Sequence, residues 1–240
     1  SIYAPNNDSE LIWFANRLGG VGITTVPDAL NWFYSQNGDF VVVNREYVDI
    51  KTENLLLLLD AGFTPSYPQT GTTWSDLSFS GNNANLFNNV SYNSDGYGSL
   101  TFNSSDSQYV TLPTNFFNPN NGTPFTITCW FKTSYTGVIF GQQNSPVPDV
   151  ASGYVPAIYV DSSGYLRTSC FWGGSVSDQS VTSSSVNDGQ WHEVTIVYDG
   201  TNQISYLDGL QFDSILKSQI NYSPTYYYFL GTGASAGWAN

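Results

Sequence analysis

From about residue 53 onward, the sequence is built of short runs in which apolar and polar residues alternate. Clear examples are "FTITCWFK" (125–132), "HEVTIVYD" (192–199) and "QISYLD" (203–208), and the segments between such runs are rich in Gly, Asn, Asp, Ser and Pro. An alternation with a period of two places one set of side chains on each face of a β-strand. Many short strands separated by turn residues predict an all-β domain of antiparallel sheets, a sandwich or barrel.

Two tight turns are predicted within this part of the chain. The stretches "YDGTNQI" (198–204) and "YLDGLQF" (206–212) each place a glycine between two alternating runs. Glycine readily takes the positive φ that short hairpins require, so both stretches predict hairpins. The run "NLLLLLD" (54–60) has no alternation, and its five leucines favour a strand that is buried on both faces.

Residues 1–52 have a different pattern. The stretch "VPDALNWFYSQNGD" (26–39) predicts one short helix, because Pro27 suits the first turn and Gly38 suits the end of a helix. An apolar stripe on this helix is expected from Leu30, Phe33 and Tyr34.

After the helix, "DFVVVNREYVDI" (39–50) predicts a strand and its turn. We therefore expect a mixed α/β N-terminal extension over 1–52, acting as an anchoring segment, and one sandwich domain over 53–240. The first ten residues lack the basic and apolar regions of a signal peptide. Ser1 is then the residue expected after removal of the initiator, and a route such as virion release by lysis would bring the protein outside the cell.

The charge balance excludes several partners. Only 10% of the residues are charged, and 6 basic against 19 acidic residues give a net charge of −13. Nucleic acids and anionic membranes bind through clustered cations, so neither is expected as a partner. No apolar run approaches the roughly 18 residues of a membrane span. Aromatic residues make up 16% of the chain, and Asn, Ser, Thr and Gly supply most of its polarity. The surface is therefore expected to be neutral and polar, as in many lectins and virion-surface proteins.

Cys129 and Cys170 both fall on the apolar sides of expected strands. Two buried free thiols are one interpretation, and a disulfide between neighbouring strands is the other. The sequence has no Cys-x-x-Cys pair, which excludes zinc ribbons and the usual redox motifs.

Three stretches occur in order: "FTITCWFK", "AIYVDSSGYLRTS" (157–169) and "DGQWHEVTIVYDGTNQISYLDG" (188–209). With them, 125–231 resembles the laminin-G-like branch of the concanavalin A-like lectin/glucanase superfamily. Its structural signature here is Trp191, His192, Asp208 and Gly209. The resemblance implies a two-sheet antiparallel jelly-roll sandwich.

A narrower resemblance covers 54–112. The stretches "LLLLDAGFTPSYPQTGTTWSDLSFSGNNANL" and "GSLTFNSSDSQYVTLP" are similar to laminin-G-like virion proteins of tailed bacteriophages, including cyanophages. The family pattern continues beyond "YYYFLGTG" into one more strand, but this sequence ends at Asn240. Either the chain is truncated, or another chain or the N-terminal extension supplies that last strand.

His192 is the one histidine of the chain, and catalysis is not expected from it. In the resembling family this histidine begins a core strand, which favours a structural role. Glycosidases of this fold need paired carboxylates. The glutamates Glu10, Glu46, Glu53 and Glu193 have no acidic neighbour at such a spacing. We therefore expect a protein without enzymatic activity and without a catalytic residue.

A sugar site needs exposed aromatic rings beside polar groups. Candidates near loop signals are Tyr154, Tyr165, Trp172 and Trp238, although each also suits packing within the sandwich. No metal or other cofactor is expected. Calcium is the alternative, with Asp106 in "NSSDSQ" (103–108) and Asp161 in "DSSG" (161–164) as weak candidates. Gln108 stands where the family often has Asp, and "DSSG" also suits a plain hairpin turn.

These observations favour a non-enzymatic phage protein on the virion surface, an extracellular particle. It would be a capsid decoration, appendage or fibre component, with other virion proteins and further copies of itself as partners. Whether its outward face also binds host-surface glycans is left open by the residues. The competing hypothesis is a dedicated carbohydrate-binding module whose task is adhesion.

Overall fold

The structure is a computed structural model of the 240-residue chain. It describes residues 2–3, 8–17, 20–35, 41–42, 54–78, 80–94, 98–114, 116–117, 123–169, 179–217 and 225–236.

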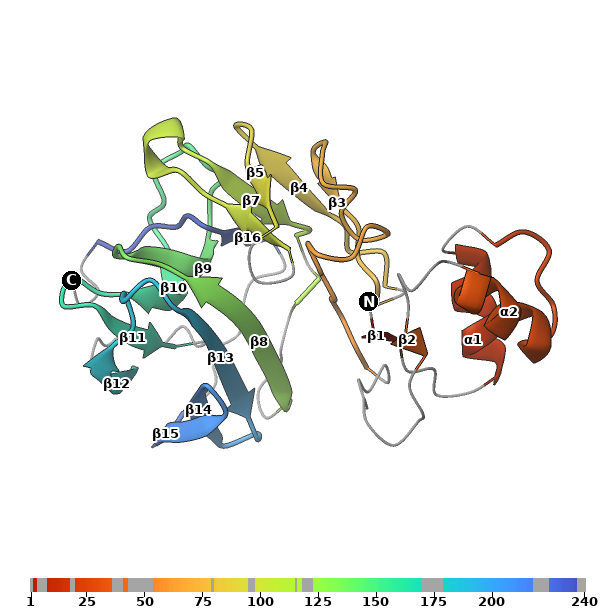
Figure 1. Ribbon diagram of the computed structural model, residues 1–240. Coiled ribbons are helices and arrows are strands. Elements are labelled where there is room, and N and C mark those ends of the chain that lie inside the picture. The colour runs from red at the N-terminus through yellow and green to blue at the C-terminus, as the bar shows by residue number, and fades with distance from the viewer. Residues whose placement is uncertain are drawn as a thin grey trace.

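Two antiparallel sheets form the main body, as the alternating runs predicted (Figure 1). The larger sheet has eight strands in the order β12-β11-β10-β9-β16-β7-β4-β3, and the smaller has four in the order β15-β14-β13-β8. The strands of the larger sheet are, in that order, Ser180–Ser185, Tyr165–Thr168, Tyr154–Val160, Gly137–Gln143, Tyr227–Leu230, Tyr109–Leu112, Ala84–Phe87 and Thr73–Trp74. Those of the smaller sheet are Leu210–Leu216, Asn202–Leu207, Trp191–Tyr198 and Phe125–Lys132.

The short hairpin β5 (Ser91–Asn93) and β6 (Ser99–Thr101) forms a separate two-stranded sheet, and one 3₁₀ turn covers Ser104–Asp106. Both predicted hairpins are present. Gly200 (φ +103°) lies between β13 and β14, and Gly209 (φ +76°) lies between β14 and β15. The sequence prediction of an all-β two-sheet sandwich is therefore confirmed.

Alternation decides which side chains enter the core. On β13, Val194, Ile196 and Tyr198 are buried, and each pairs in register with an inward residue of β8. They pack against side chains of the larger sheet such as Ile158 and Tyr228. Burying a side chain of this size contributes about 2 kcal/mol to stability.

One side of the interior is polar. Gln203 and Ser205 of β14 point inward and are fully buried, facing Thr168 of β11 and Ser180 of β12. The Gln203 amide nitrogen lies 3.1 Å from the Thr168 carbonyl oxygen and 3.3 Å from the Ser180 hydroxyl. Because these groups satisfy one another, the sheets can close over them without leaving a buried donor unpaired.

The N-terminal extension contains two helices, α1 (Asp8–Arg17) and α2 (Val26–Ser35), and the parallel pair β1 (Ile2–Tyr3) and β2 (Val41–Val42). The helices stand to one side of the sandwich (Figure 1). They share a small core of their own, formed by Leu11, Ala15, Ala29 and Phe33. Helix α2 agrees with the predicted helix, with Pro27 in its first turn, whereas α1 was not predicted.

The leucine run was predicted wrongly as a strand. Residues 55–60 form neither helix nor strand, and Leu56 is 45% exposed. The backbone N–H of Leu58 donates to the buried Asp76 carboxylate at 2.9 Å instead of to a neighbouring strand. This side-chain acceptor holds the segment in an irregular path over the core, which Leu57 and Leu59 contact.

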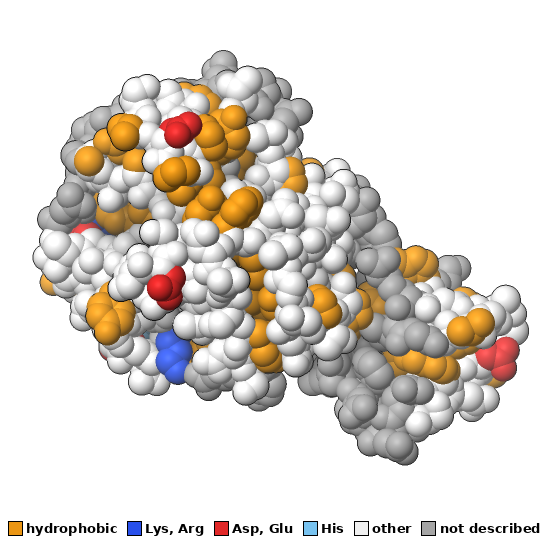
Figure 2. Space-filling view, turned by 90° about the horizontal axis from the view of Figure 1, so that it is seen from above, with side chains coloured by type: hydrophobic (Ala, Val, Ile, Leu, Met, Phe, Trp, Pro, Cys, Tyr) orange, Lys and Arg blue, Asp and Glu red, His pale blue; other side chains and the backbone are white. Residues whose placement is uncertain are grey.

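None of the helices in the described part of the chain is long and apolar enough to cross a membrane. Viewed from above, the molecule presents mostly neutral polar groups with patches of hydrophobic side chains and few charges (Figure 2). That surface agrees with the low fraction of charged residues.

Candidate functional site

The outer face of the larger sheet, which points away from the smaller sheet, carries a row of aromatic side chains. We define this aromatic row as Phe87 of β4, Tyr109 of β7, and Phe229 and Tyr227 of β16. Phe87 and Tyr109 stack with ring centroids 4.8 Å apart and planes at 6°. Phe229 meets the edge of Tyr109 at 6.0 Å and stacks on Tyr227 at 6.5 Å. The row exists because β16 lies between β7 and β9, far from both in sequence order.

The two ends of the row reach the surface. Phe87 is 40% exposed and Tyr227 is half-buried, whereas Tyr109 and Phe229 between them are buried. Asn85 precedes Phe87 by two residues and shares its face, and its register partner Thr111 lies beside it on β7. Within the described residues, neither polar side chain makes a hydrogen bond of its own. An exposed ring therefore lies beside an unengaged amide and an unengaged hydroxyl.

The segment 232–236 crosses the same face over β9 and β10. The backbone N–H of Ala234 donates to the Gln143 side-chain oxygen at 3.3 Å. The Tyr154 hydroxyl donates to the Ala236 carbonyl oxygen at 2.5 Å. Gly141 lies directly beneath, where a Cβ would come within 3.1 Å of the Thr232 carbonyl oxygen.

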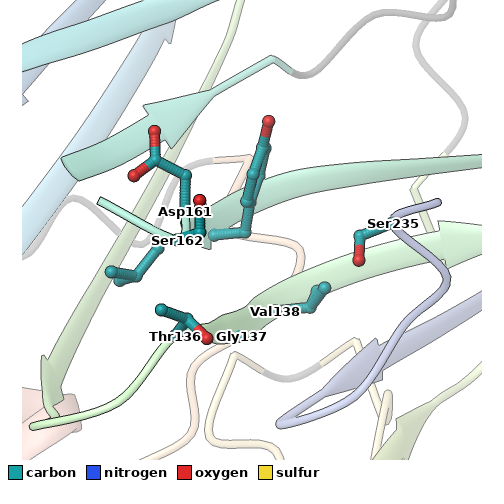
Figure 3. A pocket seen from close by; sticks show the side chains of 8 residues that line it. Thr136, Gly137, Val138, Asp161, Ser162 and Ser235 are labelled. Carbon is teal, nitrogen blue, oxygen red and sulfur yellow. The ribbon is translucent and has the colours of Figure 1, made fainter. Parts of the chain in front are cut away.

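A small pocket of about 180 Å³ opens beside this segment (Figure 3). Thr136 comes from the loop just before β9 and Val138 from the start of that strand. Ser162 comes from the turn after β10, and Ser235 comes from the C-terminal segment on the other side. The hydroxyls of the threonine and the two serines accept and donate no hydrogen bond within the described part of the chain. The Tyr159 ring also lines the pocket, but it is only 2% exposed and offers almost no surface for stacking.

Asp161 lines this pocket, but its carboxylate points away from Val138 and Ser235 (Figure 3). One carboxylate oxygen accepts from the backbone N–H groups of Ser163 and Tyr165, and the other accepts from Arg167 Nε at 2.6 Å. Burial alone would raise the Asp161 pKa, but these hydrogen bonds and the Arg167 charge hold the pKa below its usual value. Both oxygens are engaged in holding the β10–β11 turn, which leaves this carboxylate poorly placed to bind calcium.

Of the four predicted sugar-binding residues, two lie in the described part of the chain. Tyr154 begins β10 on the face of the aromatic row and flanks Gln143, which in turn pairs with Tyr227. Tyr165 begins β11 beyond the turn, and both tyrosines are half-buried. The seven residues of β10 separate Tyr154 from Tyr165 by roughly 20 Å. These two tyrosines therefore do not form one site, and Trp172 and Trp238 lie outside the described residues.

His192 lies between two carboxylates. Its Nδ1 is 2.8 Å from Asp208 Oδ2, and its Nε2 is 3.2 Å from Asp188 Oδ1. Burial alone would lower the His192 pKa, but the hydrogen bonds and charges of Asp208 and Asp188 outweigh it and raise the pKa. The other oxygen of Asp208 accepts from the Glu193 backbone N–H at 2.8 Å. This cluster joins the turn before β13 to the β14–β15 hairpin, where Gly209 follows Asp208, so it supports the backbone.

Trp191, the remaining signature residue, begins β13 opposite Lys132 of β8. The indole N–H of Trp191 is buried and has no hydrogen-bond partner in the described structure.

Asp106 is exposed in the 3₁₀ turn, where the Asn103 side-chain amide donates to it at 2.8 Å. Gln108 accepts from the Asn103 backbone N–H and donates to the Asn89 carbonyl, so its side chain ties two loops together. Within the described residues, no group of three or more His, Cys, Asp or Glu side chains could hold a metal ion.

Cys129 is a free thiol on the inner face of β8. Burial and then the nearby Glu193 charge raise the pKa of this thiol to about 12, so it stays protonated and unreactive at neutral pH. Cys170 lies outside the described residues.

The aromatic row was largely missed by sequence reasoning. The run "PTYYYFL" (224–230) does predict an outward-facing tyrosine, which the structure identifies as Tyr227. Phe87 and Tyr109 alternate outward in their own short strands, which is a usable signal. The alternation within each strand does not show, however, that these strands lie side by side in the sheet.

Trp130 was missed although its signal was clear. In "FTITCWFK" the residues Phe125, Ile127, Cys129 and Phe131 turn inward, so Trp130 must point to solvent, where it is 66% exposed.

Several solved structures are similar to this chain. Domain 4 of AbnA, a GH43 extracellular arabinanase from Geobacillus stearothermophilus in complex with arabinotriose, shares 13% identity over 69% of this chain and 79% of that chain, with a TM-score of 0.45. Mouse laminin alpha1 domains LG4-5 share 16% identity over 55% of this chain and 34% of that chain, with a TM-score of 0.36. A carbohydrate esterase from Shiga toxin-encoding bacteriophage phi24B shares 13% identity over 61% of this chain and 80% of that chain, with a TM-score of 0.35.

No curated protein matches the sequence. A family model does match, over residues 103–239, which is more than half of the chain. That model, Laminin_G_3, describes the concanavalin A-like lectin/glucanases superfamily, and the match covers most strands of both sheets, including all four of the smaller one. This chain belongs to the concanavalin A-like lectin/glucanase superfamily.

Proposed function

We propose that this protein is a non-enzymatic carbohydrate-binding protein whose ligand lies on the outer face of the larger sheet. One observation carries the proposal: the Phe87 ring, stacked on Tyr109 and 40% exposed, lies beside the unengaged side chains of Asn85 and Thr111. A sugar ring presents C–H groups on its faces and hydroxyls at its rim. An exposed ring held rigid from behind, with amide and hydroxyl groups beside it, suits both kinds of contact.

The ligand is expected to be a neutral glycan. A net charge of −13 opposes the approach of uronic or sulfated polysaccharides. Binding without hydrolysis is supported by the state of Asp161, a carboxylate that lines the pocket. Retaining glycosidases need two carboxylates about 5–5.5 Å apart, one of them free to attack. Asp161, which lines the pocket on this face, has both oxygens committed to Arg167 and the turn backbone.

The biological setting we propose is the surface of a tailed-phage particle. The resemblance of residues 54–112 to phage virion proteins supports it. So does the N-terminal extension, whose helices pack on a core of their own and could hold another virion protein. In that setting the sandwich would face outward and contact host-surface glycans. Antibodies against the sandwich should then label intact particles, and labelling only after disruption would contradict an outward position.

The decisive experiment is binding of the whole chain to an array of neutral glycans, with calcium and with a chelator. Saturable binding is expected, and Phe87→Ala should weaken it about tenfold, which corresponds to roughly 1.4 kcal/mol of lost stacking. Asn85→Ala should weaken binding to a similar or smaller extent.

Tyr135→Ala is the matched control, because Tyr135 is 81% exposed but lies in the loop before β9, apart from the aromatic row. An unchanged affinity in Phe87→Ala, with the fold intact by thermal melting, would remove this face from the proposal. Binding that requires calcium would contradict the expectation that no metal takes part.

A further inference from the structure

The outer face of the smaller sheet carries a second arrangement of aromatic and polar groups, on the opposite side of the sandwich. We define the Trp130 face as Trp130 and Thr128 of β8, Glu193 and Thr195 of β13, and Tyr206 of β14. Trp130 pairs in register with Glu193, and Thr128 pairs with Thr195. Tyr206 pairs with Thr195 from the other side. Register partners in antiparallel strands have Cβ atoms about 5 Å apart on one face, so these side chains are neighbours.

Trp130 is exposed to an unusual degree. Its side chain is 66% exposed on the outer face of a regular strand, whereas Phe131 next to it is buried in the core. Strand β8 is fixed from below by that core and from one side by all eight register pairs with β13. The indole therefore stands on a rigid base and presents an open face to solvent.

The polar side chains beside Trp130 form a chain of hydrogen bonds in which each donor and acceptor can be assigned. Thr195 Oγ1 donates to Glu193 Oε1 at 2.7 Å, which uses its hydroxyl proton. Thr128 Oγ1 lies 2.8 Å from Thr195 Oγ1 and must therefore be the donor of that pair. The chain of hydrogen bonds ends at the Glu193 carboxylate, whose Oε2 accepts no hydrogen bond from any described residue. A charged acceptor, held in place by its own network, thus lies beside an exposed indole.

We propose that the Trp130 face is a second, independent site for neutral hexose-based glycans. The sugar C–H groups would stack on the Trp130 indole, and a sugar hydroxyl would donate to Glu193 Oε2. Tyr206, half-buried two strands away, would extend the contact to a neighbouring sugar unit. This site shares no residue with the face that carries Phe87, so the chain would hold two glycans on opposite sides.

The test is calorimetric titration of the whole chain with cellohexaose, laminarihexaose and mannohexaose. At least one hexasaccharide should bind the wild type at two sites. Trp130→Ala should remove the second site, Phe87→Ala should weaken the first site about tenfold, and the double variant should keep only that weakened binding. Glu193→Gln keeps the acceptor for Thr195 but removes the charge, so it should weaken the second site about tenfold. It also serves as the test if Trp130→Ala fails to fold.

Tyr135→Ala is again the control and should leave both sites unchanged. If Trp130→Ala and Glu193→Gln both keep the wild-type stoichiometry and affinity, the second site is refuted. It is also refuted if none of the three hexasaccharides binds, or if Trp130→Ala alters only the sedimentation coefficient, which would make this face a protein interface. If Phe87→Ala has no effect while Trp130→Ala abolishes all binding, the Trp130 face stands and the function proposed for the larger sheet falls.

Discussion

At the scale of single residues, the His192 cluster shows how a conspicuous side chain can serve structure. Asp208 has φ +51°, a left-handed conformation that few residues tolerate as well as Asp and Asn. In that position one of its oxygens reaches the Glu193 N–H and the other reaches the His192 ring. The hairpin geometry and the histidine contact thus depend on the same residue.

Protonation of His192 should stabilise the fold on the acid side of neutrality. Because the folded protein raises the His192 pKa above its ordinary value of 6.5, the stabilisation is complete below about pH 6.5 and is lost as pH rises through the higher folded-state pKa. The free energy of unfolding should therefore fall as pH rises from about 6.5 through the higher folded-state pKa, by less than about 1 kcal/mol because the carboxylates are half exposed. Urea unfolding of the wild type and of His192→Gln at several pH values checks this. The same dependence of the unfolding free energy on pH in both proteins would contradict it.

Two substitutions at Asp208 separate its backbone role from its charge. Asp208→Ala loses both hydrogen bonds and places Ala at positive φ, so we expect a loss of about 2–3 kcal/mol in unfolding free energy. Asp208→Asn tolerates the same φ and keeps an acceptor for the Glu193 N–H, so its loss should stay near 1 kcal/mol, while the pH dependence should become smaller because only Asp188 still raises the His192 pKa. Equal losses in the two variants, measured by urea unfolding, would argue against this division.

At the scale of strands, two buried glutamines of the sandwich differ in whether their amide nitrogens have hydrogen-bond partners. Gln142 of β9 pairs in register with the core residues Val155 and Tyr228, yet its buried amide nitrogen has no partner in the described structure. Gln203 of β14 is equally buried, but its amide nitrogen lies within hydrogen-bonding distance of oxygens from Thr168, Ser180 and Ser205.

The same substitution should therefore have opposite effects at these two positions. Gln142→Leu should leave stability unchanged or raise it by about 1 kcal/mol, because it removes a buried donor that bonds to nothing. Gln203→Leu should cost about 3 kcal/mol, because it strips a donor from several buried oxygens. Thermal and urea unfolding of the two variants is the measurement. A large loss of unfolding free energy in Gln142→Leu would mean that the Gln142 amide has a partner after all.

Sequence reasoning succeeded where the information is local. The inward and outward residues of "FTITCWFK", the glycine turns and helix α2 all follow from neighbouring residues. It failed on residues 55–60, because the distant Asp76 carboxylate captures a backbone N–H there. It also could not join Phe87, Tyr109 and Tyr227 into one face, since β16 is inserted between β7 and β9. Which strands become neighbours is a non-local property that alternation does not encode.

At the scale of the whole molecule, the described residues form two separate hydrophobic cores. The large one lies between the sheets, and the small one lies between α1 and α2. Phe33 is 1% exposed in the small core, while none of the residues in that cluster comes from the sandwich. The two parts are therefore expected to unfold separately.

Phe33→Ala tests this independence in the full-length chain. Removing a buried phenylalanine costs about 3–5 kcal/mol, which is more than two short helices can lose and stay folded. The helical signal in far-ultraviolet circular dichroism should drop, while the thermal transition of the sandwich should keep its midpoint. Ala234→Gly, outside the helices, serves as the control. A sandwich midpoint that falls together with the helical signal would mean that the two parts fold as one unit.

Strand β8 has a consequence for handling the protein. It is the outermost strand of the smaller sheet, and from Phe125 to Phe131 it contains no charged residue, with Lys132 alone at its end. Uncharged outer strands of this length are templates on which other chains add strand by strand. Concentrated samples that are warmed toward unfolding should therefore convert into fibrils that bind amyloid dyes, and a lysine placed at Thr128 should slow that conversion during storage.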